Sequence, residues 1–200
     1  MKHTNIKEPY EFLKNHFKAV HAVLGPEFLI EIRAIYRPED KKQSIFFPFG
    51  SISKSLSNVL KLNAEGIDIY FGVNPRPISR KKKAEDIEYL ACLWTDIDVG
   101  PNRFYKTQED ALGIIRHFRT RPHLVIDSGN GFHCYWYLAK PISLKKEEQR
   151  VNVEKILAGL INSMKADPSG SSLERIMRLP GTINHKNGRK CQIMEEYNEK

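Results

Sequence analysis

The chain has 200 residues, of which 40% are hydrophobic and 28% are charged, and its formal net charge is +8. This length supports one sizeable core, and the ordinary composition excludes long disordered tracts. No apolar run is long enough to span a membrane, and the polar first residues lack a signal-peptide core, so a membrane partner is not expected. The positive charge is typical of proteins that bind a polyanion such as nucleic acid.

The three cysteines, Cys92, Cys134 and Cys191, are far apart and form no Cys-x-x-Cys pair. We expect buried free thiols, because two of them lie inside apolar, strand-like runs. Their spacing argues against a structural zinc site, so no zinc is expected. Free thiols fit a reducing compartment, and we expect a cytoplasmic protein.

The sequence pattern of the first part of the chain predicts a hairpin with a helix before it and a helix after it, followed by a further strand. The expected elements are a helix stopped by Gly25-Pro26, strands at 28–36 and 44–49, a helix at 51–62 and a strand at 67–73. Alternation in the first strand predicts a core-facing Ile30 and Ile32 and a solvent-facing Glu31 and Arg33.

The remainder alternates hairpins with helices. The expected elements are a buried strand from Tyr89, a helix from an N-cap at Thr107 to Arg119, strands at 123–127 and 132–138, a helix capped by Ser143 that ends at Met164, a short helix opened by a Ser171–Glu174 capping box, and a closing strand at 191–197. We expect Ile114 and Ile156 to face the core. This order predicts an α+β fold and not a regularly alternating parallel sheet.

Asp96 and Asp98 follow an almost wholly apolar run. Side chains alternate on a strand, so both carboxylates point to one face and repel each other unless a cation lies between them. Oxygen ligands on a rigid strand suit Mg²⁺ or Mn²⁺, held as a pair for phosphoryl transfer. The alternative is a strand end that runs into a solvated turn at 100–102.

A second motif runs from Asp127 to His133. Its Asn130-Gly131 pair favours a tight hairpin turn, and Gly129 and Gly131 allow backbone N–H groups to approach an anion. Ser128 and His133 flank this turn and can donate hydrogen bonds to phosphate oxygens. The alternative is an ordinary hairpin in which His133 is only a strand residue.

A third motif begins at Asp167, which can serve as a third carboxylate ligand. Arg175 and Arg178 lie three residues apart on the expected short helix, hence on one face, where guanidinium groups suit a triphosphate. The alternative is a helix-start aspartate followed by surface arginines. The basic run Arg80 to Lys83 predicts a loop that contacts nucleic acid or is simply solvated.

In this order, the motifs resemble those of the archaeo-eukaryotic primase superfamily. The matching stretches are Asp96-Ile97-Asp98, Ser128 to His133, Asp167 with Arg178 to Thr182, and Tyr70 to Arg76. More narrowly, the chain resembles the primase-polymerase domains of plasmid and phage replication proteins and of some CRISPR-associated proteins. The resemblance spans roughly residues 67–186.

The resemblance implies a single catalytic domain over residues 1–200. Residues 67–200 would mainly form a core with an antiparallel sheet like that of an RNA-recognition motif, fused to a smaller N-terminal α/β unit, mainly 1–66. It implies that Asp96, Asp98 and Asp167 bind two divalent metals and that Ser128 and His133 bind the phosphates of an incoming nucleotide. The implied activity is template-dependent nucleotidyl transfer, which makes or extends short primers on single-stranded DNA.

The partners implied are a single-stranded DNA template and an NTP or dNTP. Template contacts are expected from a set of basic residues, namely Arg76, Arg80, Lys81, Lys82, Lys83 and Lys186. Phe104 or Tyr105 can stack on bases, or can equally be packing residues. Relatives often carry a helicase or another replication or CRISPR-associated domain, so we expect either a bare catalytic module or a piece of a larger protein.

Three other functions compete with this one. A metal-dependent nuclease could use the same carboxylates but would have no need of a triphosphate pocket. A rolling-circle initiator needs a His-x-His pair, which the seven histidines do not form. A non-catalytic module that binds single-stranded nucleic acid requires that metal binding has been lost.

Overall fold

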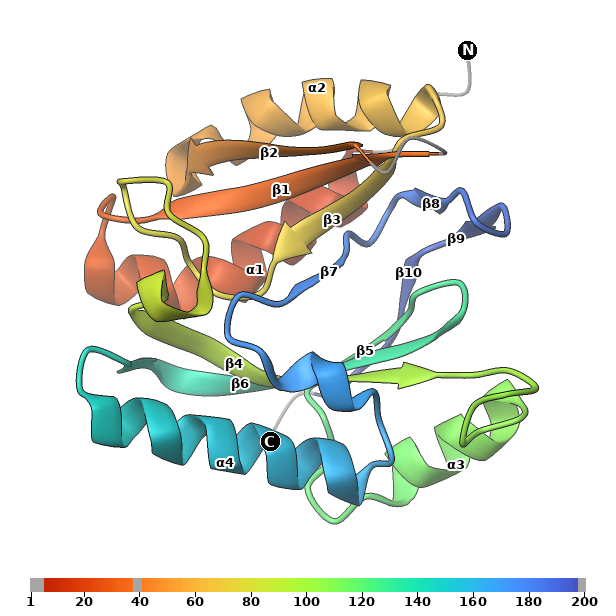
Figure 1. The fold of residues 1–200 in the computed structure, drawn as a ribbon. Coiled ribbons are helices and arrows are strands. Elements are labelled where there is room, and N and C mark those ends of the chain that lie inside the picture. Colours follow the sequence, from red (N-terminus) through yellow and green to blue (C-terminus); the bar gives the residue numbers. More distant parts are fainter. Residues whose placement is uncertain (1–5, 38–40, 198–200) are drawn as a thin grey trace.

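Residues 6–37 and 41–197 are described by the structure, a computed structural model. In them the longer strands gather into two four-stranded sheets, and two short strands form a separate hairpin (Figure 1). Every strand pairing within the two sheets is antiparallel. The predicted α+β class is therefore confirmed.

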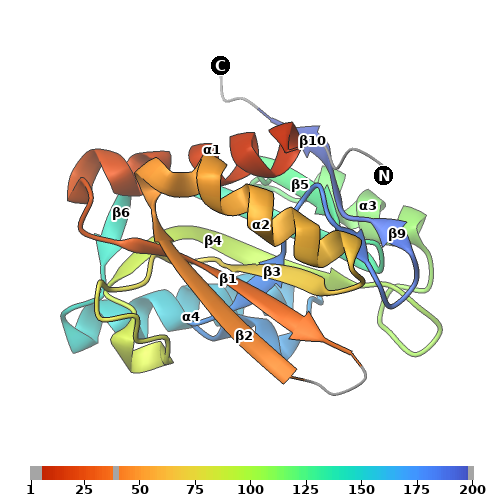
Figure 2. The same ribbon diagram turned by 90° about the horizontal axis from the view of Figure 1, so that it is seen from above.

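The first sheet has the strand order β2-β1-β3-β7. Its strands are β1 (Leu29–Tyr36), β2 (Lys41–Pro48), β3 (Asp68–Gly72) and β7 (Ile176–Arg178). Helix α2 (Ile52–Ala64) packs on β1, β2 and β3, while α1 (Lys7–Leu24) contacts α2 and also strands of the second sheet (Figures 1 and 2). The sheet takes β3 and β7 from beyond residue 66.

The second sheet has the order β10-β5-β6-β4. Its strands are β4 (Tyr89–Asp98), β5 (Leu124–Asp127), β6 (Gly131–Ser143) and β10 (Gln192–Glu196). Apolar side chains cover both of its faces: one face joins the large core shared with α1, and the other packs against α3 (Gln108–His117) and α4 (Glu147–Ser163). Double-sided burial matches the apolar run that precedes Asp96.

Short elements complete the chain. The separate hairpin pairs β8 (Ile183–Asn184) with β9 (Arg189–Lys190), and the short 3₁₀ turns are η1 (Phe49–Ser51), η2 (Ala84–Asp86) and η3 (Pro168–Ser171). None of the helices within the described ranges is long and apolar enough to cross a membrane. The three cysteines are buried and free, as predicted.

Of the predicted helix caps and core residues, some are confirmed and others are wrong. Thr107 does cap α3, because its side-chain oxygen accepts a hydrogen bond from the backbone N–H of Asp110 at 3.1 Å. Ser143 does not cap α4, because it is the last residue of β6 and pairs with Tyr89. The expected core residues Ile114 and Ile156 are 43% and 52% exposed.

The expected short helix opened by Ser171 is wrong. Ser171 closes η3, the backbone N–H of Arg175 donates to the carbonyl of Ser172 at 2.9 Å, and the chain then continues as β7. Residues of β7 pair with β3, with Arg178 opposite Tyr70. The partner strand lies more than a hundred residues earlier, so the local capping pattern competes with a long-range pairing that satisfies the same backbone groups.

Candidate active site

Asp96 lies on β4 directly opposite His133 on β6. The His133 Nε2 atom is 3.7 Å from a carboxylate oxygen of Asp96. Burial lowers the pKa of His133 to about 4, even though the nearby Asp96 carboxylate opposes this shift. The ring is therefore neutral at pH 7, with one nitrogen that carries a proton and one that does not.

Asp167 is brought to Asp96 by the backbone. Its N–H donates to the Asp96 carbonyl at 2.8 Å, which aligns the segment after α4 with the edge of β4 that β6 leaves open. The Asp167 carboxylate also accepts a bond from the backbone N–H of Ser169 at 3.0 Å. Burial alone would raise the pKa of Asp167, but the bonds from Ser169 and the charge of Arg175 outweigh it and lower that pKa.

Arg175 connects the two carboxylates. Its Nη2 atom donates to Asp96 and also lies 3.2 Å from Asp167. Its Nε atom is buried with no hydrogen-bond partner among the described residues. One positively charged group therefore contacts two acids that are far apart in the sequence, and it does so without completing its own hydrogen bonds.

Asp98 stands at the same strand end and pairs with Arg103 at 3.2 Å. Burial, followed by the nearby charges of Asp96 and Asp167, raises its pKa. The side chains of Asp96, Asp98 and Asp167 retain exposures of 19%, 29% and 25%, so solvent reaches all three. This is a mutually repelling set of acids that needs positive charge close by.

The donor chemistry fits a hard divalent ion, since carboxylate oxygens are the ligands that Mg²⁺ and Mn²⁺ prefer. Within the described ranges, no three or more His, Cys, Asp or Glu side chains are arranged to hold a metal ion. Arg175 supplies positive charge at the point where Asp96 and Asp167 converge. A metal on these two carboxylates therefore requires the guanidinium to move aside.

The β5–β6 turn is a tight hairpin, as predicted. Both the backbone N–H and the hydroxyl of Ser128 donate to the Gly131 carbonyl, at 2.9 and 3.1 Å. The Gly129 N–H donates to Asp127 at 2.7 Å, at a φ of +87°. A Cβ at position 131 would lie 2.0 Å from the Ile97 carbonyl oxygen, so only glycine allows this approach to β4.

Side chains of the β8–β9 hairpin bond to the β5–β6 turn. Asn184 donates to the Ser128 carbonyl at 3.2 Å, Asn187 donates to the Gly129 carbonyl at 2.6 Å, and Arg189 pairs with Asp127 at 2.9 Å. Lys186 is exposed in the same hairpin. Sequence reasoning missed these supporting residues, because their roles depend on a contact between distant turns.

Arg178 does not share a helix face with Arg175. It is 4% exposed on β7, where it donates to Asp68 at 2.6 Å and to the Tyr70 hydroxyl at 2.8 Å. The other Asp68 oxygen accepts from Arg37 at 2.7 Å. A charged residue at position 68 inside an otherwise apolar strand was the sequence signal for a buried ion pair, and it was missed.

Arg76 was expected to contact the template, and the structure corrects this. Its side chain is fully buried, donates to Glu31 at 2.7 Å and also to the Glu174 carbonyl at 2.9 Å. Glu31, expected at the surface, is buried with it because Arg33 and Ser44 also donate to its carboxylate. By contrast, the basic run from Arg80 to Lys83 is exposed.

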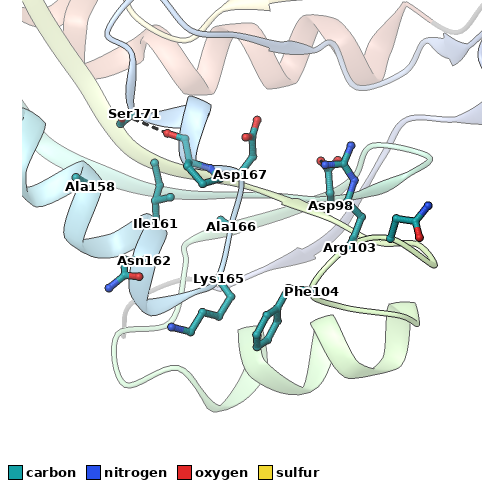
Figure 3. A pocket seen from close by; sticks show the side chains of 12 residues that line it. Asp98, Arg103, Phe104, Ala158, Ile161, Asn162, Lys165, Ala166, Asp167 and Ser171 are labelled. Atoms are coloured by element: carbon teal, nitrogen blue, oxygen red, sulfur yellow. Dashed lines mark hydrogen bonds and ion pairs between the residues drawn. The ribbon is translucent and has the colours of Figure 1, made fainter.

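A cavity of about 480 Å³ opens beside the acids (Figure 3). Asp98 and Asp167 line it together with Arg103 and Phe104 from the loop after β4, and with residues of α4 and the segment that follows it. Of the two neighbouring aromatic residues, Tyr105 is 4% exposed and Phe104 is 66% exposed. Tyr105 is therefore a packing residue.

Comparisons with solved structures agree with this fold. The AEP domain of the primase-polymerase of cyanophage S-2L superposes with a TM-score of 0.65 and 19% identity, and covers 93% of this chain and 91% of its own. The catalytic domain of the primase RepB′, solved in complex with initiator DNA, superposes with a TM-score of 0.60 and 17% identity over 94% of this chain and 85% of its own. The fold is that of AEP primase-polymerase domains.

Sequence comparison adds a further relative. A replication protein of Clostridium perfringens is 27% identical over 150 residues, which are 69% of this chain and 34% of that protein. The chain thus spans about a third of the length of the curated relative it matches. No protein-family model matches the chain.

Proposed function

We propose that this chain is the catalytic domain of a primase-polymerase of the archaeo-eukaryotic primase superfamily. It would carry out template-dependent nucleotidyl transfer, making or extending short primers on single-stranded DNA. The observation that carries this proposal is the convergence of Asp96 and Asp167 on one positively charged group, within reach of the buried imidazole of His133.

In this proposal Asp96, Asp98 and Asp167 hold two Mg²⁺ or Mn²⁺ ions. When bound, such ions activate a 3′-hydroxyl and stabilise the charge of a triphosphate. Asp96 and Asp98 come from the end of β4, and Asp167 comes from the segment after α4, whose N–H bonds to the Asp96 carbonyl at 2.8 Å. Sharing two ions would require the three side chains to close around them, because within the described ranges they are not arranged as a metal site.

His133 and the β5–β6 turn would bind the nucleotide phosphates. A neutral imidazole can donate one hydrogen bond to a phosphate oxygen without adding charge. The hydroxyl of Ser128 and the N–H of Gly129 have internal partners here, so their phosphate contacts require those bonds to be exchanged. Arg175, once displaced from the acids, would donate to the triphosphate, whereas Arg178 would act by holding Tyr70 and Asp68 in place.

The template would run along exposed basic residues. Arg80, Lys81, Lys82, Lys83 and Lys186 are all exposed and can contact the phosphates of single-stranded DNA. RepB′ is recorded with initiator DNA, and the sequence relative is a replication protein, which supports a replicative role over a CRISPR-associated one. A helicase or another replication domain would act with this module.

A synthesis assay tests the proposal. Purified protein is given unprimed or primed single-stranded DNA, Mg²⁺ or Mn²⁺, and NTPs, dNTPs or both, in parallel with Asp96→Ala. Products that require template and nucleotide, and that disappear in the variant, support it. Degradation of DNA without nucleotide would instead identify a nuclease, and DNA binding with neither reaction would identify a non-catalytic module.

A further inference from the structure

The acids lie between two different surroundings. In the second sheet β6 is on one side of β4, so the β5–β6 turn and His133 are on that side of Asp96. Asp167 lines the opposite edge of β4, and the cavity beside it is formed by the loop after β4, α4 and the segment after α4 (Figure 3). Going across the site, the order is nucleotide-binding turn, acids, cavity.

The loop in the cavity wall is held firmly. The Tyr105 hydroxyl donates to the Met164 carbonyl at 2.9 Å, and the Tyr105 carbonyl accepts from the Gly100 N–H at 2.9 Å. Lys106 closes the loop with bonds to the carbonyls of Pro101 and Arg103, at 2.8 and 2.7 Å. These bonds fix the backbone on both sides of Phe104.

Phe104 is the most exposed large hydrophobic side chain in the described ranges, at 66%. Its ring lies at 77° to that of Tyr105, with centroids 5.0 Å apart, and the rest of its surface is largely open to solvent. An exposed aromatic ring on a rigid loop is a surface on which a nucleic-acid base stacks.

Basic side chains line the cavity as well as the acids. Arg103 and Lys165 line it, and the Arg103 side chain is 57% exposed while it pairs with Asp98. A guanidinium and an ammonium group beside an aromatic ring suit a nucleotide phosphate and its base. The volume of about 480 Å³ is within the range of small-molecule ligand pockets, which is roughly 300–1,000 Å³.

We propose that this cavity receives the nucleotide that carries the attacking 3′-hydroxyl, with its base on Phe104 and its phosphate near Arg103 and Lys165. The inference rests on the proposed function, in which the incoming triphosphate takes the His133 side of the acids. In the reaction the 3′-oxygen bonds to the α-phosphorus, the bond from that phosphorus to pyrophosphate breaks, and the hydroxyl proton leaves to water. The two reactants therefore flank the acids, and the cavity is on the flank that the triphosphate does not use.

Photocrosslinking tests this assignment without requiring synthesis. A DNA oligonucleotide with 5-iodo-2′-deoxyuridine at its 3′ end, and separately a 5-iodouridine triphosphate used as the initiating nucleotide, are irradiated with the protein and Mn²⁺, and the adducts are mapped by mass spectrometry. We expect adducts at Phe104 with the oligonucleotide, and with the free triphosphate only when no primer is present. These two arms distinguish a primer terminus from an initiating nucleotide.

Binding measurements on three variants accompany the mapping. Phe104→Ala should weaken binding of the 3′ end about tenfold, as expected from the loss of one stacked base, and Phe104→Tyr should restore it. Ile114→Ala, which removes another exposed apolar side chain, on α3, is the matched control and should change nothing. The affinity for a nucleotide bound beside a primer should not change in any of them.

The proposal is overturned if the 3′-end adducts map to the β5–β6 turn. It is also overturned if Phe104→Ala weakens the binding of the incoming nucleotide and leaves the binding of the primer unchanged. Synthesis with adducts away from Phe104 would leave the proposed function standing and remove this site. Adducts at Phe104 with no synthesis under any condition would show that the cavity binds a DNA end, but would remove the proposed function and with it the assignment of that end as the attacking group.

Discussion

Two arginine–carboxylate groups in this molecule have the same chemistry and different surroundings. In the first sheet, Glu31 and Arg76 are both fully buried, and Arg33 and Ser44 complete the bonds of the carboxylate. At the second sheet, Asp96 and Arg175 are each 19% exposed. Each arginine has one buried nitrogen without a partner among the described residues, Nη1 in Arg76 and Nε in Arg175, so exposure to solvent is what separates the two pairs. We therefore expect the buried Glu31 to keep its arginine (the closed pair), whereas the partly exposed Asp96 can exchange its arginine for another cation (the open pair).

The largest expected effect comes from opening the closed pair. Glu31→Gln leaves Arg76 charged and buried without a counter-ion, which should cost about 3–5 kcal/mol in the free energy of unfolding. The same carboxylate-to-amide change at the open pair, Asp96→Asn, should cost little, because solvent reaches Arg175. Urea unfolding of the two variants measures both values, and equal losses would contradict the distinction.

Synthesis activity should depend more on the open pair than on the closed pair, the reverse of the order expected for stability. Asp96→Asn should lower synthesis by roughly a hundredfold or more, because it removes a carboxylate from the proposed metal site. Primer extension with Mg²⁺ measures the loss, and Glu109→Gln on the exposed first turn of α3 is the control. If the Asp96 variant kept wild-type activity, the proposed function would be wrong.

A smaller effect, on metal affinity, is expected from removing the arginine of the open pair. Arg175→Gln removes the positive charge that competes for Asp96 and Asp167, so Mn²⁺ should bind about tenfold more tightly in the absence of nucleotide. Titration followed by electron paramagnetic resonance measures the affinity. Arg116→Gln, which breaks an exposed pair with Glu195, is the matched control. Unchanged or weaker Mn²⁺ binding in the Arg175 variant would show that no displacement is needed.

The smallest effect concerns acid stability. Burial alone would raise the pKa of Asp68, but the bonds from Arg178, Arg37 and the His185 N–H outweigh it and lower that pKa. The stability from these bonds is complete above the pKa of an unfolded aspartate, about 4, and is lost as the pH falls through the lower folded value. Urea midpoints between pH 7 and pH 3 should therefore fall less steeply in Asp68→Asn than in the wild type.

Local patterns predicted the parts of the site that local structure builds. The apolar run before Asp96 and the Asn-Gly turn before His133 each determine a strand end or a hairpin through neighbouring residues, and both were found where expected. Arg175 and Arg178 were placed wrongly, because a capping pattern was read where β7 pairs with β3. Arg76 and Glu31 were placed on the surface, because nothing near them in the sequence indicates a partner 45 residues away.

The course of the chain from Asp167 to Arg178 has a mechanical consequence. At its start the Asp167 N–H is bonded to β4 in the second sheet, and at its end the segment is a strand of the first sheet, with the Arg175 carbonyl bonded to the N–H of Val73 at 3.0 Å. The segment is thus a strap between the two sheets, with an acid at one anchor and the arginine that contacts it near the other. A change in the distance between the two sheets would therefore move this segment. It would also change the contact between Arg175 and the acids, and so the positive charge that these acids receive.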